Sequence, residues 1–314
     1  MNVPSRLQMQ TFLYTYTCHE DELPLCRLEL RTLFGVEPRQ GYLESGIELD
    51  PSRSPFMKKR LTVKYMGDSL SAITDQIREL ELGGHTFKIV YVEADGDADY
   101  NEQRAIEREL GAHVRGRADM RQPQRLYGIA YAEGRWLFGE CRTSEAVWLQ
   151  HNDKPQNYST ALSTRVARAV ANIAVPRTPG VKAVDPCCGI GTVLIEALSM
   201  GIDIVGYDIN PLAVRGARVN LAHFGMPDVV SIGDIRSLSG SYDAAIVDLP
   251  YNLCSKLSSE QRLEMLAAAR RLAGRVVIIA TETIDGDIVQ AGLTISDRCV
   301  VRKGAFARQI LVCS

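Results

Sequence analysis

Asp248, Leu249, Pro250 and Tyr251 follow directly on an apolar run and could together handle an amine. The carboxylate can accept one hydrogen bond from an N–H group, and the main-chain carbonyl of Leu249 can accept a second. Pro250 fixes its own backbone angle, which would hold both acceptors in place before a substrate arrives. Tyr251 offers a ring face for stacking a base. These residues favour a site for the exocyclic amine of a nucleobase, although they could also simply cap and shape a loop.

A glycine turn upstream suggests a cofactor. In DPCCGIGT (185–192), Gly189 and Gly191 allow a sharp turn and close approach of a ligand, and Thr192 begins a helix. Asp208 follows 23 positions after Asp185 and could accept hydrogen bonds from both hydroxyls of a ribose. A turn without any ligand is the alternative, and the adjacent Cys187 and Cys188 would then be small packing residues.

Two cofactor classes suit a strand, a glycine turn, a helix and a distal acid. A nicotinamide or flavin dinucleotide requires a third glycine, but Leu194 occupies that position. Asp185 would also repel a pyrophosphate. S-adenosylmethionine has no phosphate and carries an ammonium and a sulfonium, so an acid beside the turn favours this methyl donor.

The elements that must position these residues alternate between strand and helix from residue 160 onward. Several short apolar strands end on an aspartate, and helices lie between them; the strands are expected at 181–185, 203–208, 228–234, 242–248 and 275–281. This alternation predicts a mostly parallel sheet covered on both faces, an α/β fold that binds ligands at the carboxyl ends of its strands. Asp185, Asp208, Asp234 and Asp248 would share that edge.

The first half of the chain has a different character. It contains strands at 11–17 and 86–94, a helix at 99–111, and a polar segment at 151–159 that resembles a linker. The formal net charge of −2 gives no overall attraction to nucleic acid, so any RNA site must be a local patch. The candidates for phosphate contacts are basic residues that could equally be solvated surface charges: Arg115, Arg117, Arg121, Arg125, Lys58 and Lys59.

The stretches DPCCGIGTVLIEA, GYDINPLAVRGARVN and DLPY together resemble the RNA guanine-N2 methyltransferases that carry a THUMP domain. The resemblance is specific over about 155–314 and weaker before that. It implies a Rossmann-like class I methyltransferase domain at 161–314 after a linker at 151–160. It also implies a ferredoxin-like module at 1–55 and a THUMP-like RNA-binding domain at 56–150.

The same resemblance implies roles for individual residues. Asp248 to Tyr251 would handle the target amine of a structured RNA, usually tRNA. Leu249 stands where the family usually has proline, and Asn252 stands where a small residue is common, so the target base is left open. The S-adenosylmethionine site would comprise Asp185, Pro186, Cys188, Gly189, Gly191, Thr192, Asp208, Ile209, Asn210, Asp234 and Ile235.

Composition narrows the remaining possibilities. The 314 residues contain no apolar run of the roughly 20 residues that a membrane span needs. The eight cysteines and five histidines form no metal-binding pattern, and we expect reduced thiols, a cytoplasmic location and a monomer. Three alternatives remain: an adenine-N6 nucleic-acid methyltransferase, an inactive protein that binds RNA and cofactor, and a nicotinamide-dependent oxidoreductase.

Overall fold

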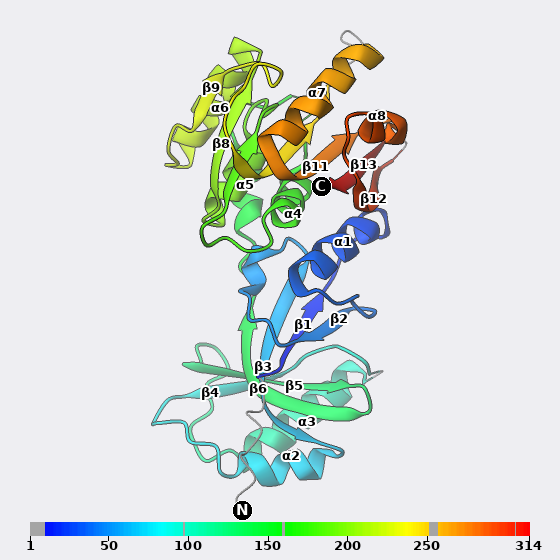
Figure 1. Cartoon of the computed structure of the whole chain (residues 1–314). Coiled ribbons are helices and arrows are strands. Elements are labelled where there is room, and N and C mark those ends of the chain that lie inside the picture. Colours follow the sequence, from blue (N-terminus) through cyan, green and yellow to red (C-terminus); the bar gives the residue numbers. More distant parts are fainter. Residues whose placement is uncertain (1–9, 97, 159–160, 251–256, 305) are drawn as a thin grey trace, which may run out of the picture. The chain divides into compact units, whose positions relative to one another are not determined.

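The computed structural model describes residues 10–96, 98–158, 161–250, 257–304 and 306–314. The chain forms two compact units, each described here by itself. The first comprises Met1–Thr17 and Val36–Glu145, and the second comprises Cys18–Gly35 and Ala146–Ser314. Figure 1 labels their elements.

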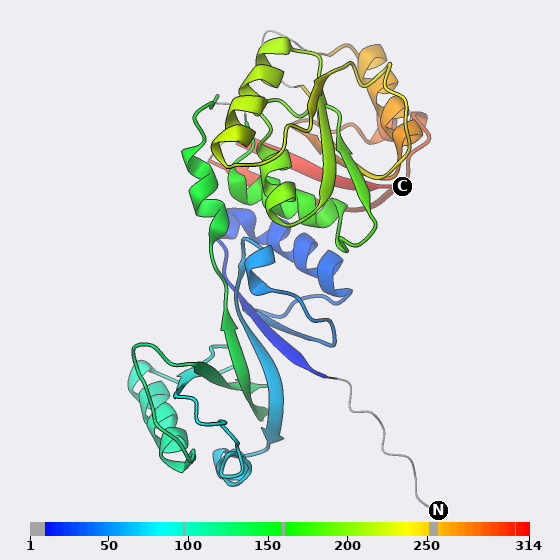
Figure 2. The ribbon, with the colours of Figure 1, turned by 90° about the vertical axis from the view of Figure 1, so that its left-hand side faces the viewer.

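The first unit contains a six-stranded sheet in the order β2-β1-β3-β6-β5-β4. Its long strands β3 and β6 pair antiparallel, and Figure 2 shows them side by side in light blue and green. Its elements are β1 (Phe12–Tyr16), β2 (Tyr42–Ser45), η2 (Pro51–Arg53), β3 (Met57–Gly67), α2 (Leu70–Ile77), β4 (Phe87–Tyr91), α3 (Tyr100–His113), β5 (Arg125–Ala132) and β6 (Arg135–Thr143). Because β1 pairs with β3, residues on both sides of the boundary expected at residue 55 share one sheet.

The second unit contains a seven-stranded sheet in the order β12-β13-β11-β10-β7-β8-β9. Strands β9, β8, β7, β10 and β11 are parallel, whereas β13 runs antiparallel to β11 and to β12. The strands are β7 (Lys182–Asp185), β8 (Asp203–Asp208), β9 (Val230–Ile232), β10 (Tyr242–Asp248), β11 (Ala273–Ala280), β12 (Ile295–Lys303) and β13 (Phe306–Cys313). The expected mostly parallel sheet is therefore confirmed, with an antiparallel hairpin added at one edge.

Helices connect and cover these strands. They are η1 (Glu20–Glu22), α1 (Leu23–Phe34), η3 (Val147–Asp153), α4 (Thr164–Ala174), α5 (Thr192–Ser199), α6 (Pro211–His223), α7 (Ser259–Leu272) and α8 (Asp285–Gln290). One core joins α7 to alternate residues of β10 and β11, such as Val247 and Ile278. Burial of such side chains stabilises the unit by about 1.5–3 kcal/mol each. The sheet edge that carries Asp248 is thereby held rigid.

Helix α1 precedes most of the first unit in the sequence but packs against α4 and β12 of the second. Two fully buried side chains join it to α4, because Asn172 Nδ2 donates to Glu29 Oε1 over 2.6 Å. The segment 151–158, for which the sequence indicated a linker, is also packed in this unit. Its His151 is buried and lies 2.7 Å from Glu196 of α5.

Candidate active site

The turn between β7 and α5 depends on its glycines. Gly189 and Gly191 have φ angles of 54° and 79°, which a residue with a side chain adopts only under strain. A Cβ on Gly191 would also lie 3.2 Å from the Cβ of Ala217 in α6. Small size at these positions therefore lets the chain turn from strand into helix while α6 packs against it.

Asp208 ends β8 and is held by main-chain donors. Its Oδ2 accepts from the N–H of Gly189 over 2.8 Å, and its Oδ1 accepts from the N–H of Asn210 over 2.8 Å. Asn210 in turn caps α6 by accepting from the N–H of Leu212. Each carboxylate oxygen retains acceptor capacity, so Asp208 is oriented to receive two further hydroxyl donors.

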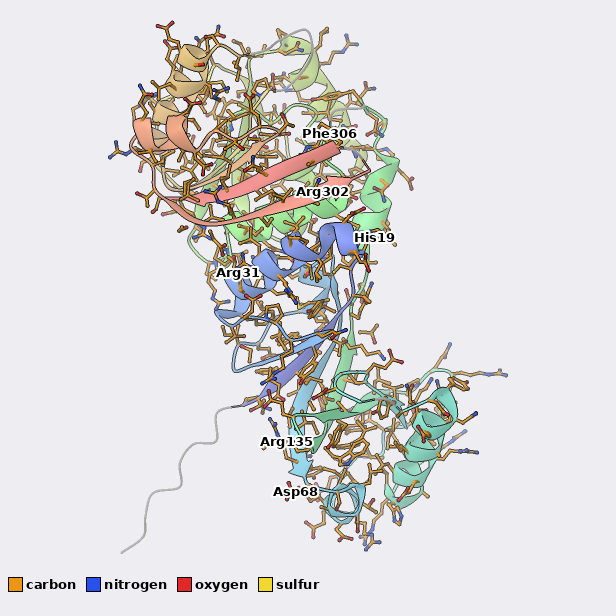
Figure 3. All side chains as sticks on the ribbon, turned by 90° about the vertical axis from the view of Figure 1, so that its right-hand side faces the viewer. His19, Arg31, Asp68, Arg135, Arg302 and Phe306 are labelled. Carbon is orange, nitrogen blue, oxygen red and sulfur yellow. The ribbon has the colours of Figure 1, made fainter. Side chains whose placement is uncertain are left out.

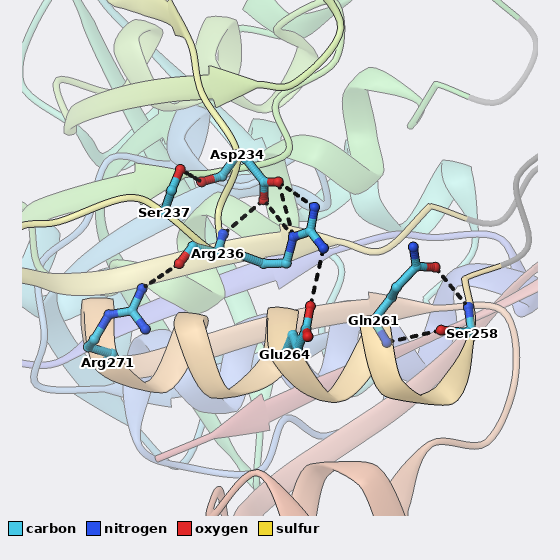
Figure 4. Close-up of polar contacts among 7 residues, drawn as sticks. All are labelled: Asp234, Arg236, Ser237, Ser258, Gln261, Glu264 and Arg271. Atoms are coloured by element: carbon cyan, nitrogen blue, oxygen red, sulfur yellow. Dashed lines mark hydrogen bonds and ion pairs between the residues drawn. The ribbon is translucent and has the colours of Figure 1, made fainter.

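Asp234, which follows β9, lies in a different environment (Figure 4). Both of its carboxylate oxygens bind the guanidinium of Arg236, which also contacts Glu264 of α7 over 3.1 Å. These hydrogen bonds lower the pKa of Asp234. Asp234 is therefore ionised and holds Arg236 against Glu264 of α7, an arrangement that the sequence did not reveal.

Asp248 ends β10 and carries a buried oxygen. Among the residues that the structure describes, none hydrogen-bonds to its Oδ1. Burial raises the pKa of Asp248 to about 7, against the opposing charge of Arg308. Such a carboxylate is poised to accept hydrogen bonds or a proton near neutral pH.

Asp185 is buried at the end of β7, and its Oδ1 accepts from the N–H of Cys187. Burial raises its pKa well above the usual range, and the charges of Asp248 and Asp208 raise it further. Three carboxyl groups from neighbouring strands thus lie close enough to influence one another. A ligand with positive charge would relieve this repulsion.

One cavity of about 1050 Å³ unites these groups. Its described lining contains four aspartates, at 185, 208, 234 and 248, and a single basic residue, Arg236. Predicted residues in the lining are Asp185, Pro186, Cys188, Gly189, Thr192, Asp208, Ile209, Asn210, Asp234, Ile235, Asp248, Leu249 and Pro250. Gly191 lies behind this lining, in the turn itself. The predicted stacking residue Tyr251, together with Asn252, lies outside the described residues.

Comparison with known proteins agrees with this geometry. Residues 152–285 match a family model described as UPF0020, RMKL-like, methyltransferase domain. The chain is 28% identical over 242 residues to the tRNA (guanine(10)-N2)-dimethyltransferase of Methanothermobacter thermautotrophicus, covering 69% of this chain and 70% of that relative. It is 31% identical over 117 residues to a probable tRNA (guanine(10)-N2)-dimethyltransferase of Methanothermococcus thermolithotrophicus, covering 33% of this chain and 72% of the relative. The chain belongs to the guanine-N2 RNA methyltransferase family.

Two further similarities are more limited. The mouse U6 snRNA (guanine-N(2))-methyltransferase THUMPD2 is 30% identical over 133 residues, which cover 40% of this chain but 25% of the mouse protein. The crystal structure of TrmN from Thermus thermophilus aligns over 97% of this chain and 99% of that chain, with a TM-score of 0.47 and 18% identity.

The cavity of this guanine-N2 methyltransferase fits S-adenosylmethionine, its methyl donor. The fixed carboxylate of Asp208 could accept hydrogen bonds from a ribose, and Ile209 and Ile235 could provide apolar surface for an adenine ring. The buried carboxyl of Asp185 could bind the ammonium of the methionine end. The hydroxyl of buried Thr192 also has no hydrogen-bond partner among the described residues, as expected of a group that would hydrogen-bond to a bound ligand.

Tyr158 is a site residue that the sequence reading missed. It lines the cavity from the segment before α4, and a Cβ built on Gly189 would meet its hydroxyl. Burial, together with the charges of Asp208 and Asp248, raises the pKa of the Tyr158 hydroxyl to about 12. Its signal was an aromatic residue within a polar stretch, which resembles a linker rather than a site.

The candidate RNA-binding residues all lie in the first unit. Arg115, Arg117 and Arg121 are exposed in the connection between α3 and β5. Arg125 begins β5 and lies 3.6 Å from Glu140. On β3, Lys58 is exposed and Lys59 is half-buried, with its Nζ donating to the carbonyl of Tyr91.

Two negative findings concern the described residues alone. They contain no group of three or more His, Cys, Asp or Glu side chains that could hold a metal ion. No helix formed by them is long and apolar enough to cross a membrane.

Proposed function

We propose that this protein transfers a methyl group to the exocyclic N2 of a guanosine in tRNA. The observation that carries the proposal is the buried Oδ1 of Asp248, which has no partner among the described residues and lies in the same cavity as Asp208 and the glycine turn. When bound, S-adenosylmethionine supplies an electrophilic methyl group on a positively charged sulfur. The carboxylates around the cavity complement that charge.

The role of Asp248 follows from the chemistry of the target. The lone pair of an exocyclic amine is delocalised into the ring, so the amine is a weak nucleophile. Asp248 in its ionised form accepts a hydrogen bond from one N–H of the amine, and the carbonyl of Leu249 accepts a hydrogen bond from the other. These two contacts direct the lone pair of the amine nitrogen toward the methyl group. The Leu249 side chain packs in the core with α7, and its N–H donates to Ile279 over 3.0 Å. Core packing thus fixes the main chain at Leu249, where the family usually has proline.

The target base must leave its helix or already lie in a loop in order to enter the cavity. We assign Tyr251 the stacking contact on the resemblance of the DLPY motif. A base held between such contacts gains about 1–3 kcal/mol from stacking, which offsets part of the cost of exposing it.

The first unit would be the RNA-holding part. The ferredoxin-like module and the THUMP-like domain that the resemblance implies at 1–55 and 56–150 would lie largely in it, apart from α1 and the start of η3, which belong to the second unit. Support comes from its combination of helices with a sheet of parallel and antiparallel strands, and from exposed Arg115, Arg117 and Arg121. Phosphate contacts of this kind would position an RNA without reading its sequence. We place the reaction in the cytoplasm, carried out by a monomer, in keeping with the free state of the seven described cysteines.

The test is a nucleoside analysis. tRNA from a strain that lacks the protein is incubated with tritiated S-adenosylmethionine and the purified full chain, then digested and separated. N2-methylguanosine or N2,N2-dimethylguanosine should appear with wild type and not with Asp248→Asn. N6-methyladenosine alone would instead support the adenine methyltransferase, and no transfer to any RNA would support an inactive binding protein.

A further inference from the structure

The tip of the β12–β13 hairpin combines basic and aromatic residues in the sequence VRKGAFAR (301–308). No role follows from the cavity for these residues, because Arg302, Phe306 and Arg308 are absent from its lining. Figure 3 shows Arg302 and Phe306 together at one end of the hairpin. Phe306 keeps 41% of its surface exposed, so its ring is accessible to a ligand.

Strand register places this tip at the catalytic edge of the sheet. Asp248 of β10 is aligned with Ile279 of β11, which is aligned with Ile310 of β13. The last paired residue of β11 is Ala280, opposite Gln309. Residues 306–308 therefore extend past the carboxyl end of β11, at the same edge of the sheet at which Asp248 ends β10. The lateral distance from β10 to β13 is two strand spacings, about 10 Å.

The same register decides which side chains share a face. Aligned residues point to one face of a sheet, and successive residues alternate. Arg308 and Phe306 lie two and four positions before Ile310, so both share the face of Asp248. Arg302 is aligned with Ala307 and thus belongs to the opposite face.

Arg308 and Phe306 are already organised as a pair. The Cζ of Arg308 lies over the Phe306 ring, 4.6 Å from its centroid. The charge of Arg308 also reaches Asp248, since it opposes the effect of burial on the pKa of that carboxyl. A guanidinium over an exposed ring provides a stacking surface and a phosphate ligand in one place.

We propose that Phe306 and Arg308 form a platform for the RNA nucleotide next to the target guanosine. This inference rests on the proposed function, because it takes the target base to enter the cavity beside Asp248, two strands away from β13. Its flanking base stacks on the Phe306 ring, and its phosphate binds Arg308. The platform lies outside the cavity, so it acts on RNA binding and not on the cofactor.

The experiment compares variants of the full chain for affinity toward bulk tRNA in the presence of S-adenosylhomocysteine. Phe306→Ala should weaken RNA binding about tenfold, whereas Phe306→Tyr keeps the ring and should bind like wild type. Arg308→Gln should reduce the slope of log affinity against log salt by about one, and Arg308→Lys should restore that slope. Arg302→Gln removes the same charge from the opposite face and is the matched control.

Methyl transfer and thermal unfolding are measured in parallel on every variant. A rise in KM for tRNA with unchanged affinity for S-adenosylhomocysteine and an unchanged Tm supports the platform. Equal losses in Arg302→Gln and Arg308→Gln, or wild-type affinity in Phe306→Ala, would overturn it. If wild type binds tRNA but methylates no guanosine, the proposed function fails while the affinity comparison still decides the platform. If wild type does not bind tRNA, both fail.

Discussion

Arg31 holds Asp297 through two parallel hydrogen bonds of 2.7 Å, although 266 positions separate them in the sequence. Arg31 lies on α1, near the start of the chain, and Asp297 lies on β12, near its end. A planar guanidinium that meets a carboxylate with two bonds is the strongest form of such a pair. This contact ties the helix into the methyltransferase unit.

We expect Arg31→Ala to lower the free energy of unfolding by about 1 kcal/mol, because the pair is partly exposed. The hydrogen bond from Arg31 lowers the pKa of Asp297, so the stabilisation is present above the unfolded pKa of about 4 and lost as pH falls further. Urea unfolding at pH 7 and pH 3 tests this. Arg298→Ala, which breaks the more exposed pair with Asp285, should cost less.

Asp248→Asn should abolish methyl transfer while sparing the cofactor. The amide keeps the size of the side chain but carries no negative charge and has one acceptor oxygen instead of two, and we expect kcat to fall about 10²–10³-fold or more. Calorimetric affinity for S-adenosylhomocysteine should change less than threefold. A variant that retains more than a tenth of wild-type kcat would exclude Asp248 from the chemistry.

The same substitution should stabilise the protein at high pH. Burial raises the pKa of Asp248 to about 7, above its value in the unfolded chain. Its carboxyl therefore destabilises wild type increasingly from pH 4 to 7, and fully above pH 7. The free energies of unfolding of wild type and Asp248→Asn, measured by urea unfolding, should diverge over this range in favour of the variant and reach a constant difference on the order of 2–4 kcal/mol. Equal divergence at all pH values would contradict this origin.

Enzyme activity should depend on the same titration. Only ionised Asp248 accepts the target amine, so kcat/KM for RNA should rise with pH and level off. The midpoint should lie at or below 7, because the positive charge of the bound cofactor favours the carboxylate. Initial rates between pH 5 and 9 at constant ionic strength give this midpoint. A midpoint of the acid limb well above pH 7 would assign the pH dependence to another group.

Gly189→Ala should impair cofactor binding through two separable causes. A Cβ there would clash with the Tyr158 hydroxyl, and the φ angle of 54° strains any side chain. Tyr158→Phe removes the clash but not the strain. The double variant should therefore recover part of the lost affinity for S-adenosylhomocysteine, and full recovery or none would each contradict the account.

The exposed arginines at 115, 117 and 121 should contribute to RNA affinity through phosphates. Replacing all three with Gln should reduce the slope of log affinity against log salt by about two to three. Lys182→Gln, an exposed cation in the second unit, is a control. An unchanged slope would show that these arginines are solvated surface charges that do not contact RNA phosphates.

The parallel sheet and the aspartates at its edge could be predicted because several of the short apolar runs end on an aspartate. Asp208 and Asp248 occupy the expected strand ends for that reason. Periodicity could not reveal that α1 packs on the second unit, because the partners Asn172 and Asp297 are distant in sequence. Helix propensity is local, whereas the choice of packing partner is tertiary.

Tyr158 and Arg236 were missed for a related reason. Each acts through a contact with a residue from another segment, namely Gly189 and Glu264. A polar stretch with proline predicts an irregular segment, but such a segment can still line a cavity. The register of β13 likewise decides what Phe306 faces, and register is invisible until strands are paired.

The interleaving of the two units has a consequence for how the chain is made and folded. The ribosome releases α1 early, yet β12, which it contacts, emerges only after more than 260 further residues. Until β12 has been synthesised, the apolar side of α1 stays exposed. Bringing α1 and β12 together then closes a long loop, which is slow. We expect docking of the first helix to be among the last events in the folding of the catalytic unit, because its partner strand β12 is synthesised so much later.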